Sequence, residues 1–388
     1  MRVLMINVVC GIRSTGRICT DLATALEAQG HEVKIAYGRE EVPEKYQKYA
    51  VRIGTDLDVK LHGLRARLFD GCGWGSRRAT EKFIEWVKEY DPDVIHLHNL
   101  HGYYINIGVL FRYLKGCGKK IIWTLHDCWA FTGHAAYCEA ANCELWTTAC
   151  HDCPKRNDYP VSLIDRSEKN WNKKKELLSG IQNMTIVTPS YWLADLVRRS
   201  FLSEYDVETI HNGIDTNVFK PTDCTEIRKK LGTGNKKVIL GVAAIWDERK
   251  GLKDFIELSR LLDFAEYQIV LVGLSKKQID ELPKRIIGIE KTNSVDELVQ
   301  LYSLAYVFVN PTYEDNYPTT NLEAIACGTP VITYDTGGSG ESANVYGIVL
   351  KEKNVKQLAR KIQLINKCPL EMSDVVENDT IRKYIALY

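Results

Sequence analysis

The chain has 388 residues, which suggests two domains, and its 45% hydrophobic and 26% charged residues are typical of a globular protein rather than a fibrous or disordered one. No apolar run approaches the roughly 18 residues of a transmembrane helix, and the apolar start of the chain predicts a buried strand rather than a signal peptide. The net charge of +1 gives no reason to expect a nucleic-acid partner. Twelve cysteines in a chain of this size, without an export signal, favour reduced thiols or a metal site.

The first half of the chain alternates short apolar strands with amphipathic helices. We expect strands at residues 3–9, 32–36, 94–98 and 120–125, one ending at 185–189, and helices at 19–29 and 80–89. This alternation predicts a parallel sheet covered by helices on both faces. Residues 128–158 interrupt it, because they are rich in cysteine and aromatic residues, and we interpret them as a loop inserted into the first domain.

A second series of the same kind follows. We expect strands at residues 237–243, 268–272, 306–310 and 330–334, and helices at 252–262, 295–303 and 320–326. The sequence therefore predicts two doubly wound α/β domains, 1–205 and 206–373, with a C-terminal helix at 374–388 that packs back on the first domain. Ligands of such sheets bind beyond the carboxyl ends of the strands, so we expect binding residues directly after the strands.

Residues 306–333 (YVFVNPTYEDNYPTTNLEAIACGTPVIT) carry acids around an expected helix start. Glu314 and Asp315 follow a strand, Thr319 or Thr320 can cap the next helix, and Glu323 lies on its first turn. Free amides and the helix dipole at such a start attract an anion. A carboxylate on each side of that anion could hold the hydroxyls of a nucleotide sugar. A capping arrangement with solvated acids is the alternative.

This stretch resembles the Glu-x7-Glu motif of the retaining family-four glycosyltransferases, which have the two-domain GT-B fold. The ending LEAIACGTPVI is close to the family pattern, with Asp315 at the position of the first acid and Glu314 one residue before it. The resemblance implies that the first acid contacts the transferred sugar and that Glu323 holds the ribose hydroxyls. Either Glu314 or Asp315 can be the acid that contacts the sugar.

Other segments fit the same family. Residues 209–219 (TIHNGIDTNVF) resemble its inter-domain segment, and 337–341 (GGSGE) resemble the turn after the motif helix. Residues 247–251 (DERKG) resemble the Lys-Gly motif that binds the donor diphosphate, which makes Lys250 the phosphate ligand and Arg249 its assistant. The amides of Thr319, Thr320 and Asn321 would join them. A solvated charge pair at a helix start is the alternative for Arg249 and Lys250.

The family often has an arginine six residues before that lysine, where this chain has Ala244. Arg249, or Arg13 or Arg17 of the first domain, can supply the charge. Arg13 and Arg17 flank a glycine loop, residues 11–16 (GIRSTG), whose Gly16 the family places near the donor phosphates. This loop matches neither a dinucleotide-binding nor a Walker pattern.

Several histidines follow strands in the first domain. The resemblance puts His126, within residues 124–127 (TLHD), at the reaction centre. His96 and His98 point to the same face of a strand and His101 lies beyond it. Three histidines can bind a metal, but without a nearby acid we favour contact with the acceptor or simple packing.

The inserted loop carries four cysteines within 16 residues, Cys138, Cys143, Cys150 and Cys153. Their spacing suggests a closed structural zinc site, in which His134 or His151 can replace one ligand. Four reduced thiols or a redox-active pair are the alternatives. Residues 60–78 mix basic and apolar side chains, which is typical either of a segment that rests on an anionic membrane or of a surface helix.

Together these features predict a GT-B glycosyltransferase that resembles the enzymes of colanic acid and capsule biosynthesis. It would move a sugar from a nucleotide-diphosphate donor to a saccharide on a polyprenyl-diphosphate carrier, in the cytoplasm or on the inner face of the membrane. His126, Asp315 and Lys250 are the expected catalytic residues, and no metal is expected in catalysis. A GT-B-fold epimerase or phosphorylase, and a non-catalytic sugar-nucleotide binding protein, are the alternatives.

Overall fold

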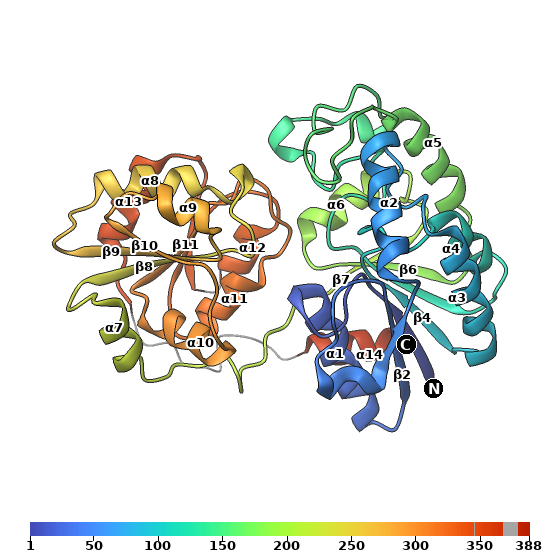
Figure 1. Cartoon of the computed structure of the whole chain (residues 1–388), viewed down its shortest axis with the longest axis horizontal. Coiled ribbons are helices and arrows are strands. Elements are labelled where there is room, and N and C mark those ends of the chain that lie inside the picture. Colours follow the sequence, from blue (N-terminus) through green and yellow to red (C-terminus); the bar gives the residue numbers. More distant parts are fainter. Residues whose placement is uncertain (345, 368–378) are drawn as a thin grey trace. The chain divides into compact units, whose positions relative to one another are not determined.

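The computed structural model describes residues 1–344, 346–367 and 379–388, and these divide into two compact units (Figure 1). Unit 1 comprises Met1–His211 together with Thr380–Tyr388, and unit 2 comprises Asn212–Asp379. The expected boundary after residue 205 falls before the observed one, because β7 (Asp206–Thr209) pairs with the first sheet. Of the expected C-terminal helix, residues 374–378 lie outside the described residues, and Thr380–Tyr388 group with unit 1.

Unit 1 contains seven parallel strands in the order β3-β2-β1-β4-β5-β6-β7. Besides β7, its strands are β1 (Arg2–Ile6), β2 (Glu32–Tyr37), β3 (Ala50–Arg52), β4 (Val94–Leu97), β5 (Lys120–Thr124) and β6 (Met184–Thr188). Its helices are α1 (Arg13–Ala28), α2 (Asp56–Phe69), α3 (Arg77–Tyr90), α4 (Ile107–Leu114), α5 (Ser167–Leu178), α6 (Tyr191–Arg199), α14 (Thr380–Leu387) and the 3-10 turns η1 (Glu44–Tyr49), η2 (Glu139–Ala141) and η3 (Leu145–Thr147).

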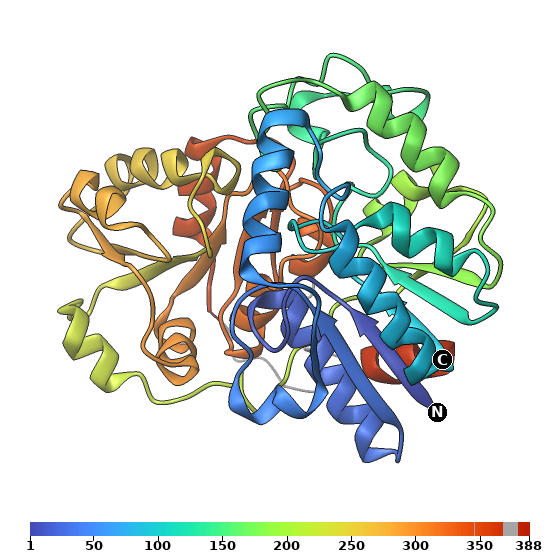
Figure 2. The ribbon, with the colours of Figure 1, turned by 45° about the vertical axis from the view of Figure 1, so that its right-hand side comes forward.

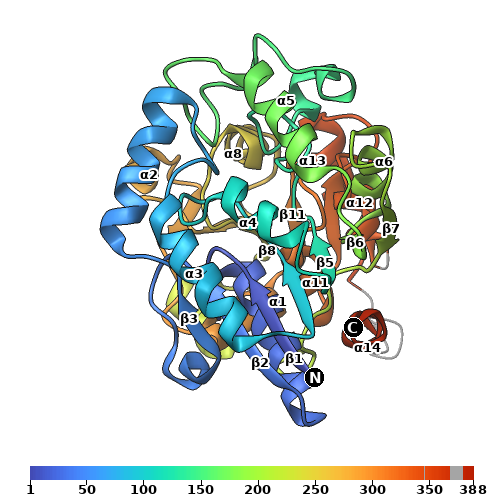
Figure 3. The same ribbon diagram turned by 90° about the vertical axis from the view of Figure 1, so that its right-hand side faces the viewer.

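Alternate residues of the central strand β1 serve two separate cores. Val3 and Met5 pack with α1 and α14, whereas Leu4 and Ile6 pack with α3 and α4 on the opposite face. Both helices of the first face lie next to one another, as Figures 1 and 3 show. The last described helix thus completes the cover of the first sheet.

Unit 2 contains six parallel strands in the order β10-β9-β8-β11-β12-β13. The strands are β8 (Lys237–Val242), β9 (Tyr267–Val272), β10 (Ile286–Ile289), β11 (Val307–Asn310), β12 (Val331–Tyr334) and β13 (Gly347–Leu350). The helices are α7 (Thr225–Leu231), η4 (Glu248–Lys250), α8 (Leu252–Leu261), α9 (Lys276–Glu281), α10 (Val295–Leu304), α11 (Thr319–Ala326), α12 (Ser339–Ala343) and α13 (Val355–Leu364).

Strand order creates one special position in this sheet. From β8 the chain moves outward to β9 and β10, then returns to place β11 on the other side of β8. The loops that follow β8 and β11 therefore leave the sheet in opposite directions, and this switch point is where open α/β sheets bind ligands.

The fold class predicted from the sequence is confirmed: both units are doubly wound α/β structures, and each strand and helix expected there is present with shifted ends. The largest shift is in α1, which begins at Arg13 rather than at residue 19. In the chain apart from residues 345 and 368–378, no helix is long and apolar enough to cross a membrane.

Candidate functional site

An ion pair joins the two loops at the switch point of unit 2. The ammonium group of Lys250, at the end of η4, bonds to the carboxylate of Asp315 in the loop after β11. Both side chains are largely buried, so this pair is shielded from water and stronger than a surface pair. The structure thus brings together two residues that are 65 positions apart and that the sequence assigned to one site.

Backbone and side-chain contacts of Arg249 reinforce this junction. Its guanidinium donates to the carbonyl of Glu314 at 2.9 Å, and its own carbonyl accepts from the amide of Tyr313 at 2.8 Å. Gly251 follows with a φ of +72°, and a Cβ there would lie 2.3 Å from the carbonyl oxygen of Pro311. Only glycine allows the two loops to approach so closely, which explains the Lys-Gly pair structurally.

Glu314 and Asp315 are both buried, with 1% and 9% of their surface exposed. The carboxylate of Asp315 accepts from the amide of Asn316 at 3.1 Å, and its carbonyl accepts from the amide of Gly338 at 3.2 Å. Gly338 belongs to the turn after β12. Asp315 is therefore tied to the turn after β12 and to Lys250.

The start of α11 differs from the expected capping arrangement. We expected Thr319 or Thr320 to cap this helix, but the N-cap residue is Pro318, whose side chain has no hydrogen-bonding group. The expectation was wrong because the helix begins one residue earlier, which places both threonines inside its first turn. They are half-buried there, where their amides and hydroxyls can meet an anion.

Asn321 has an internal structural role that the sequence did not predict. Its side-chain oxygen accepts from Asn310 at 3.0 Å, its side-chain nitrogen donates to Ser342 at 2.8 Å, and its amide donates to Pro318 at 3.1 Å. The side chain is completely buried. These bonds tie α11 to the end of β11 and to α12, so the residue positions the helix start.

Glu323 is buried in α11 and lies just past its first turn, because the helix begins one residue earlier than expected. The hydroxyl of Tyr302, from α10, donates to its carboxylate at 2.8 Å. Sequence reasoning missed Tyr302, because its only signal is an apolar position on a predicted helix. This hydrogen bond fixes one oxygen of the acid and orients the carboxylate.

In unit 1, His98 and His126 follow the neighbouring strands β4 and β5. Nδ1 of His98 lies 3.1 Å from Nε2 of His126, and the rings stack at 5.4 Å between centroids. Burial lowers the pKa of His126 to about 4, so it is neutral at pH 7. A neutral imidazole in this position can exchange one hydrogen bond with a sugar hydroxyl.

His96 packs against His98. The centroids of their rings are 4.1 Å apart, and Nδ1 of His96 lies 2.6 Å from the hydroxyl of Tyr388, beyond the end of α14. Burial lowers its pKa to about 3. The sequence placed His96 and His98 on one face of a strand, but it gave no signal for the distant tyrosine.

His101 has the acidic neighbour whose absence we inferred. Its Nε2 lies 2.7 Å from the carboxylate of Asp127, and its Nδ1 lies 2.9 Å from the hydroxyl of Tyr159. The inference was wrong because β4 and β5 are adjacent, which brings the residues after them together. Both ring nitrogens of His101 thus have partners within unit 1.

The glycine loop of unit 1 is a tight turn into α1. Gly16 is buried in the first turn of this helix, and a Cβ there would lie 3.0 Å from Cγ2 of Val9 and 3.2 Å from the amide nitrogen of Gly11. Arg13 forms an ion pair with Glu40 at 2.6 Å. A side chain at position 16 would thus be tightly packed, so packing favours a glycine there.

Comparison with known proteins decides the family. The profile described as "Glycosyltransferase Family 4" matches residues 15–218, more than half of the chain, and that described as "Glycosyl transferases group 1" matches residues 223–382. The chain belongs to glycosyltransferase family 4. It is accordingly an enzyme that transfers a sugar from a nucleotide-sugar donor, and the resemblance noted in its sequence is confirmed.

Relatives of this glycosyltransferase include the putative colanic acid biosynthesis glycosyl transferase WcaC of Escherichia coli, 23% identical over 99% of this chain and 94% of the relative. Another relative comes from Campylobacter jejuni and is 30% identical over 50% of this chain and 57% of the length of the relative. It is the N,N'-diacetylbacillosaminyl-diphospho-undecaprenol alpha-1,3-N-acetylgalactosaminyltransferase.

Two solved structures share the fold over the whole chain. Sucrose-phosphate synthase of Thermosynechococcus elongatus has a TM-score of 0.69 at 18% identity and is covered over 94% of its length. Anabaena HepE in complex with UDP has a TM-score of 0.67 at 15% identity and is covered over 98%. These matches confirm the GT-B fold predicted for the glycosyltransferase.

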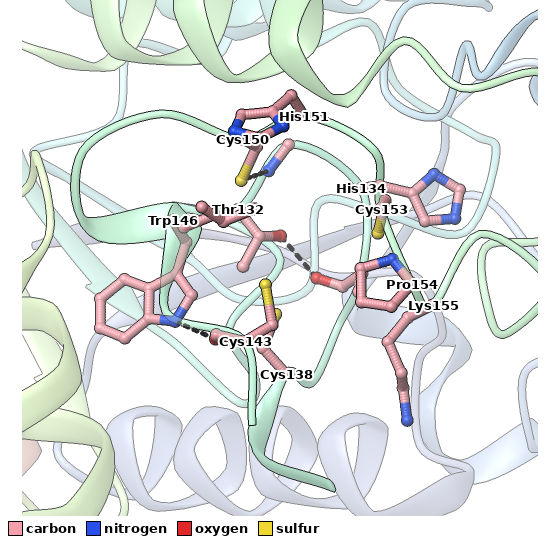
Figure 4. Close-up of a pocket in the computed structure, with 13 residues that line it drawn as sticks. Thr132, His134, Cys138, Cys143, Trp146, Cys150, His151, Cys153, Pro154 and Lys155 are labelled. Carbon is pink, nitrogen blue, oxygen red and sulfur yellow. Dashed lines mark hydrogen bonds between the residues drawn. The ribbon is translucent and has the colours of Figure 1, made fainter. Parts of the chain in front are cut away.

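The inserted loop of the glycosyltransferase gathers its four cysteines around one small cavity. Cys138, Cys143, Cys150 and Cys153 all line it, and Figure 4 shows sulfur atoms entering from opposite sides. None of the four cysteines forms a disulfide bond. Apart from residues 345 and 368–378, no three histidine, cysteine, aspartate or glutamate side chains are already grouped closely enough to hold a metal ion.

The two histidines of the loop have other environments. Nδ1 of His134 lies 2.6 Å from the carboxylate of Asp70, and in Figure 4 its ring is turned away from Cys138 and Cys143. His151 is exposed beside Asp152. The four thiols are therefore better placed than either imidazole to face the cavity.

Helix α2 occupies most of the basic and apolar segment 60–78 and is the long upright helix in blue in Figure 2. It buries only His62 and Ala66. Its exposed large apolar side chains, between 37% and 64% exposed, recur at helical spacing: Leu57, Leu61, Leu64, Leu68 and Phe69. Residues 60–69 of the segment thus belong to a surface helix, whose exposed positions include an apolar stripe next to basic side chains.

Proposed function

We propose that the enzyme transfers a sugar, with retention of configuration at the anomeric carbon, to a saccharide linked to a polyprenyl diphosphate during assembly of a bacterial surface polysaccharide. The Lys250–Asp315 pair at the switch point carries this proposal, because it places a shielded cation beside an uncapped helix start. The names of the relatives from E. coli and C. jejuni support the polysaccharide and the lipid-linked acceptor.

In the proposed mechanism, unit 2 binds the donor and stabilises its leaving group. Negative charge develops on the nucleoside diphosphate as the glycosidic bond breaks. Lys250 and Arg249, with the amides of Thr319 and Thr320, would meet this charge in an environment already arranged for it. Glu323 would accept hydrogen bonds from the ribose, in the orientation that Tyr302 gives it.

In unit 2, Asp315 would contact the transferred sugar. Asp315 is paired with Lys250, so its carboxylate oxygens can accept hydrogen bonds from sugar hydroxyls while its partner faces the diphosphate. In unit 1, His126 is neutral and would contact a substrate hydroxyl as an uncharged imidazole. Balance of the diphosphate charge by lysine and arginine would make catalysis independent of a divalent metal.

Helix α2 supports contact with a membrane, where a lipid-linked acceptor would be found. Its apolar stripe is accompanied by Lys60, Arg65 and Arg67, which could approach anionic headgroups. We therefore place the enzyme in the cytoplasm, on the inner face of the cell membrane.

Donor and product analysis tests the proposal. The purified enzyme is incubated with UDP-, GDP- or ADP-sugars and a synthetic polyprenyl-diphosphate saccharide, in EDTA, and the product is examined by mass spectrometry and NMR. We expect one added sugar with the anomeric configuration of the donor. An inverted linkage would contradict the retaining mechanism, and conversion of the donor without acceptor would indicate an epimerase.

A further inference from the structure

We propose that the inserted loop binds one structural zinc ion through the thiolates of Cys138, Cys143, Cys150 and Cys153. The first observation is that all four side chains line one cavity, although they come from separate turns of an irregular segment. The cavity is about 10 Å³, close to the least that holds a single water, so it fits one small ion and no organic ligand.

A backbone amide points at one of the sulfur atoms. The amide of Gly133 donates to Sγ of Cys150 at 3.2 Å. Such a donor stabilises a thiolate more than a neutral thiol, which accepts only weakly. A Cβ on Gly133 would lie 2.2 Å from the carbonyl oxygen of Ser167, so only glycine brings this amide to the sulfur.

A buried cation, Lys174, contacts the backbone of the inserted loop. The ammonium of Lys174 donates to the carbonyls of Trp129 at 2.6 Å and Thr132 at 3.1 Å, at the base of the loop. Four thiolates around Zn²⁺ carry a net charge of −2, which a neighbouring ammonium partly offsets.

Binding would change the loop as well as fill it. The thiols are not yet within reach of a common centre, so the ion would draw the turns at Cys138–Cys143 and Cys150–Cys153 together. Each thiol would release its proton as its sulfur bonds to zinc. With four protein ligands the site would be closed to substrate, so zinc would order the loop without taking part in sugar transfer.

Elemental analysis tests the proposal on the full chain. Enzyme produced with added zinc and purified under reducing conditions should contain about one zinc per chain. Cys150→Ser/Cys153→Ser should lose it, whereas the matched control Cys117→Ser/Cys224→Ser, which removes two partly buried thiols outside the loop, should keep it. A full equivalent of zinc in the first variant would overturn the ligand assignment.

Thiol labelling decides the matter should the loop variant fail to fold. Wild-type enzyme is alkylated with iodoacetamide, with Zn²⁺ or after exposure to a chelator, and the labelled positions are identified by mass spectrometry. We expect Zn²⁺ to protect Cys138, Cys143, Cys150 and Cys153 together and to leave Cys117 and Cys224 unchanged. Equal labelling of the four in both conditions, or disulfides among them, would overturn the site.

Discussion

Nδ1 of His98 lies 3.1 Å from Nε2 of His126, and this contact orients the second imidazole through the first. Nε2 of His98 has no hydrogen-bond partner among the residues that the structure describes. Since both rings are neutral, one must donate and the other accept, so the contact selects a tautomer of His126. Under the proposed function, in which His126 contacts substrate, His98 is a positioning residue.

We predict that His98→Phe lowers kcat about tenfold, which corresponds to the loss of one hydrogen bond of about 1.4 kcal/mol. Donor KM should change little, because unit 2 is untouched. Steady-state kinetics checks the prediction, and His98→Asn should restore part of the rate. A purely structural role would instead lower Tm without separating kcat from KM.

Lys250→Ala should lower kcat about a hundredfold or more, because it removes a charge from the leaving diphosphate and leaves the buried carboxylate of Asp315 without its partner. Lys253→Ala is the matched control, since Lys253 lies three residues away on the surface and pairs with exposed Glu248. Turnover of a defined acceptor measures both variants. Near-normal turnover of Lys250→Ala would exclude this residue from the reaction.

Tyr302→Phe should weaken donor binding about five- to tenfold, because the hydroxyl that fixes the Glu323 carboxylate is lost while the packing of the ring remains. Calorimetry with the nucleoside diphosphate measures the effect. Tyr267→Phe, on strand β9 of the same unit, serves as the control. If both variants bind the nucleotide as the wild type does, Glu323 does not depend on Tyr302.

Stability should fall in acid partly because of His62. Its Nε2 accepts from the amides of Gly73 and Gly75, both at 3.1 Å, which a protonated nitrogen cannot do. Burial lowers its pKa to about 4, so its contribution is complete above the unfolded pKa and decreases as the pH falls toward the folded one. Between pH 7 and pH 5 this one group should cost up to about 2 kcal/mol of unfolding free energy.

Denaturant unfolding of His62→Gln checks that prediction. The variant should lose at most about 1 kcal/mol relative to wild type at pH 7, because the side-chain oxygen of glutamine can still accept from the two buried amides and is not protonated in this pH range. It should also lose less additional stability between pH 7 and pH 5. The control is His31→Gln on the surface. Parallel pH profiles of wild type and His62→Gln would refute the assignment.

Vesicle binding should depend on the outer face of α2. Leu61→Gln/Leu64→Gln removes two exposed apolar side chains and should reduce sedimentation with vesicles that contain anionic lipid several-fold. Leu261→Gln/Leu364→Gln makes the same change at exposed positions of unit 2. Equal binding of the two variants would argue against a membrane role for this helix.

The sequence predicted the fold well where elements have a clear hydrophobic pattern. Strands such as β8 and β9 are buried on both faces and appear as continuous apolar runs. Helices α2 and α5 lack that signal, because α2 carries its leucines outward and α5 buries Lys174. Their positions depend on tertiary contacts that no local pattern records.

The sequence predicted the site residues that follow each single strand. It did not predict contacts between residues that follow different strands. Lys250, Asp315 and Glu323 each belong to a motif, whereas the pairing of His101 with Asp127 depends on the adjacency of β4 and β5. Asn321 shows a further limit. A polar residue at a helix start looks like a ligand in sequence, yet here its hydrogen bonds lie inside the protein.

Unit 1 is interrupted by the whole of unit 2, and this affects how the protein is made. The ribosome completes residues 1–211 long before it reaches α14. Until then, Val3, Met5 and Ile122 lack the helix that helps to cover them. His96 likewise lacks Tyr388 until the end of synthesis. The nascent first domain therefore exposes an apolar face throughout translation of the second, a period in which it is prone to aggregate and suited to protection by a chaperone.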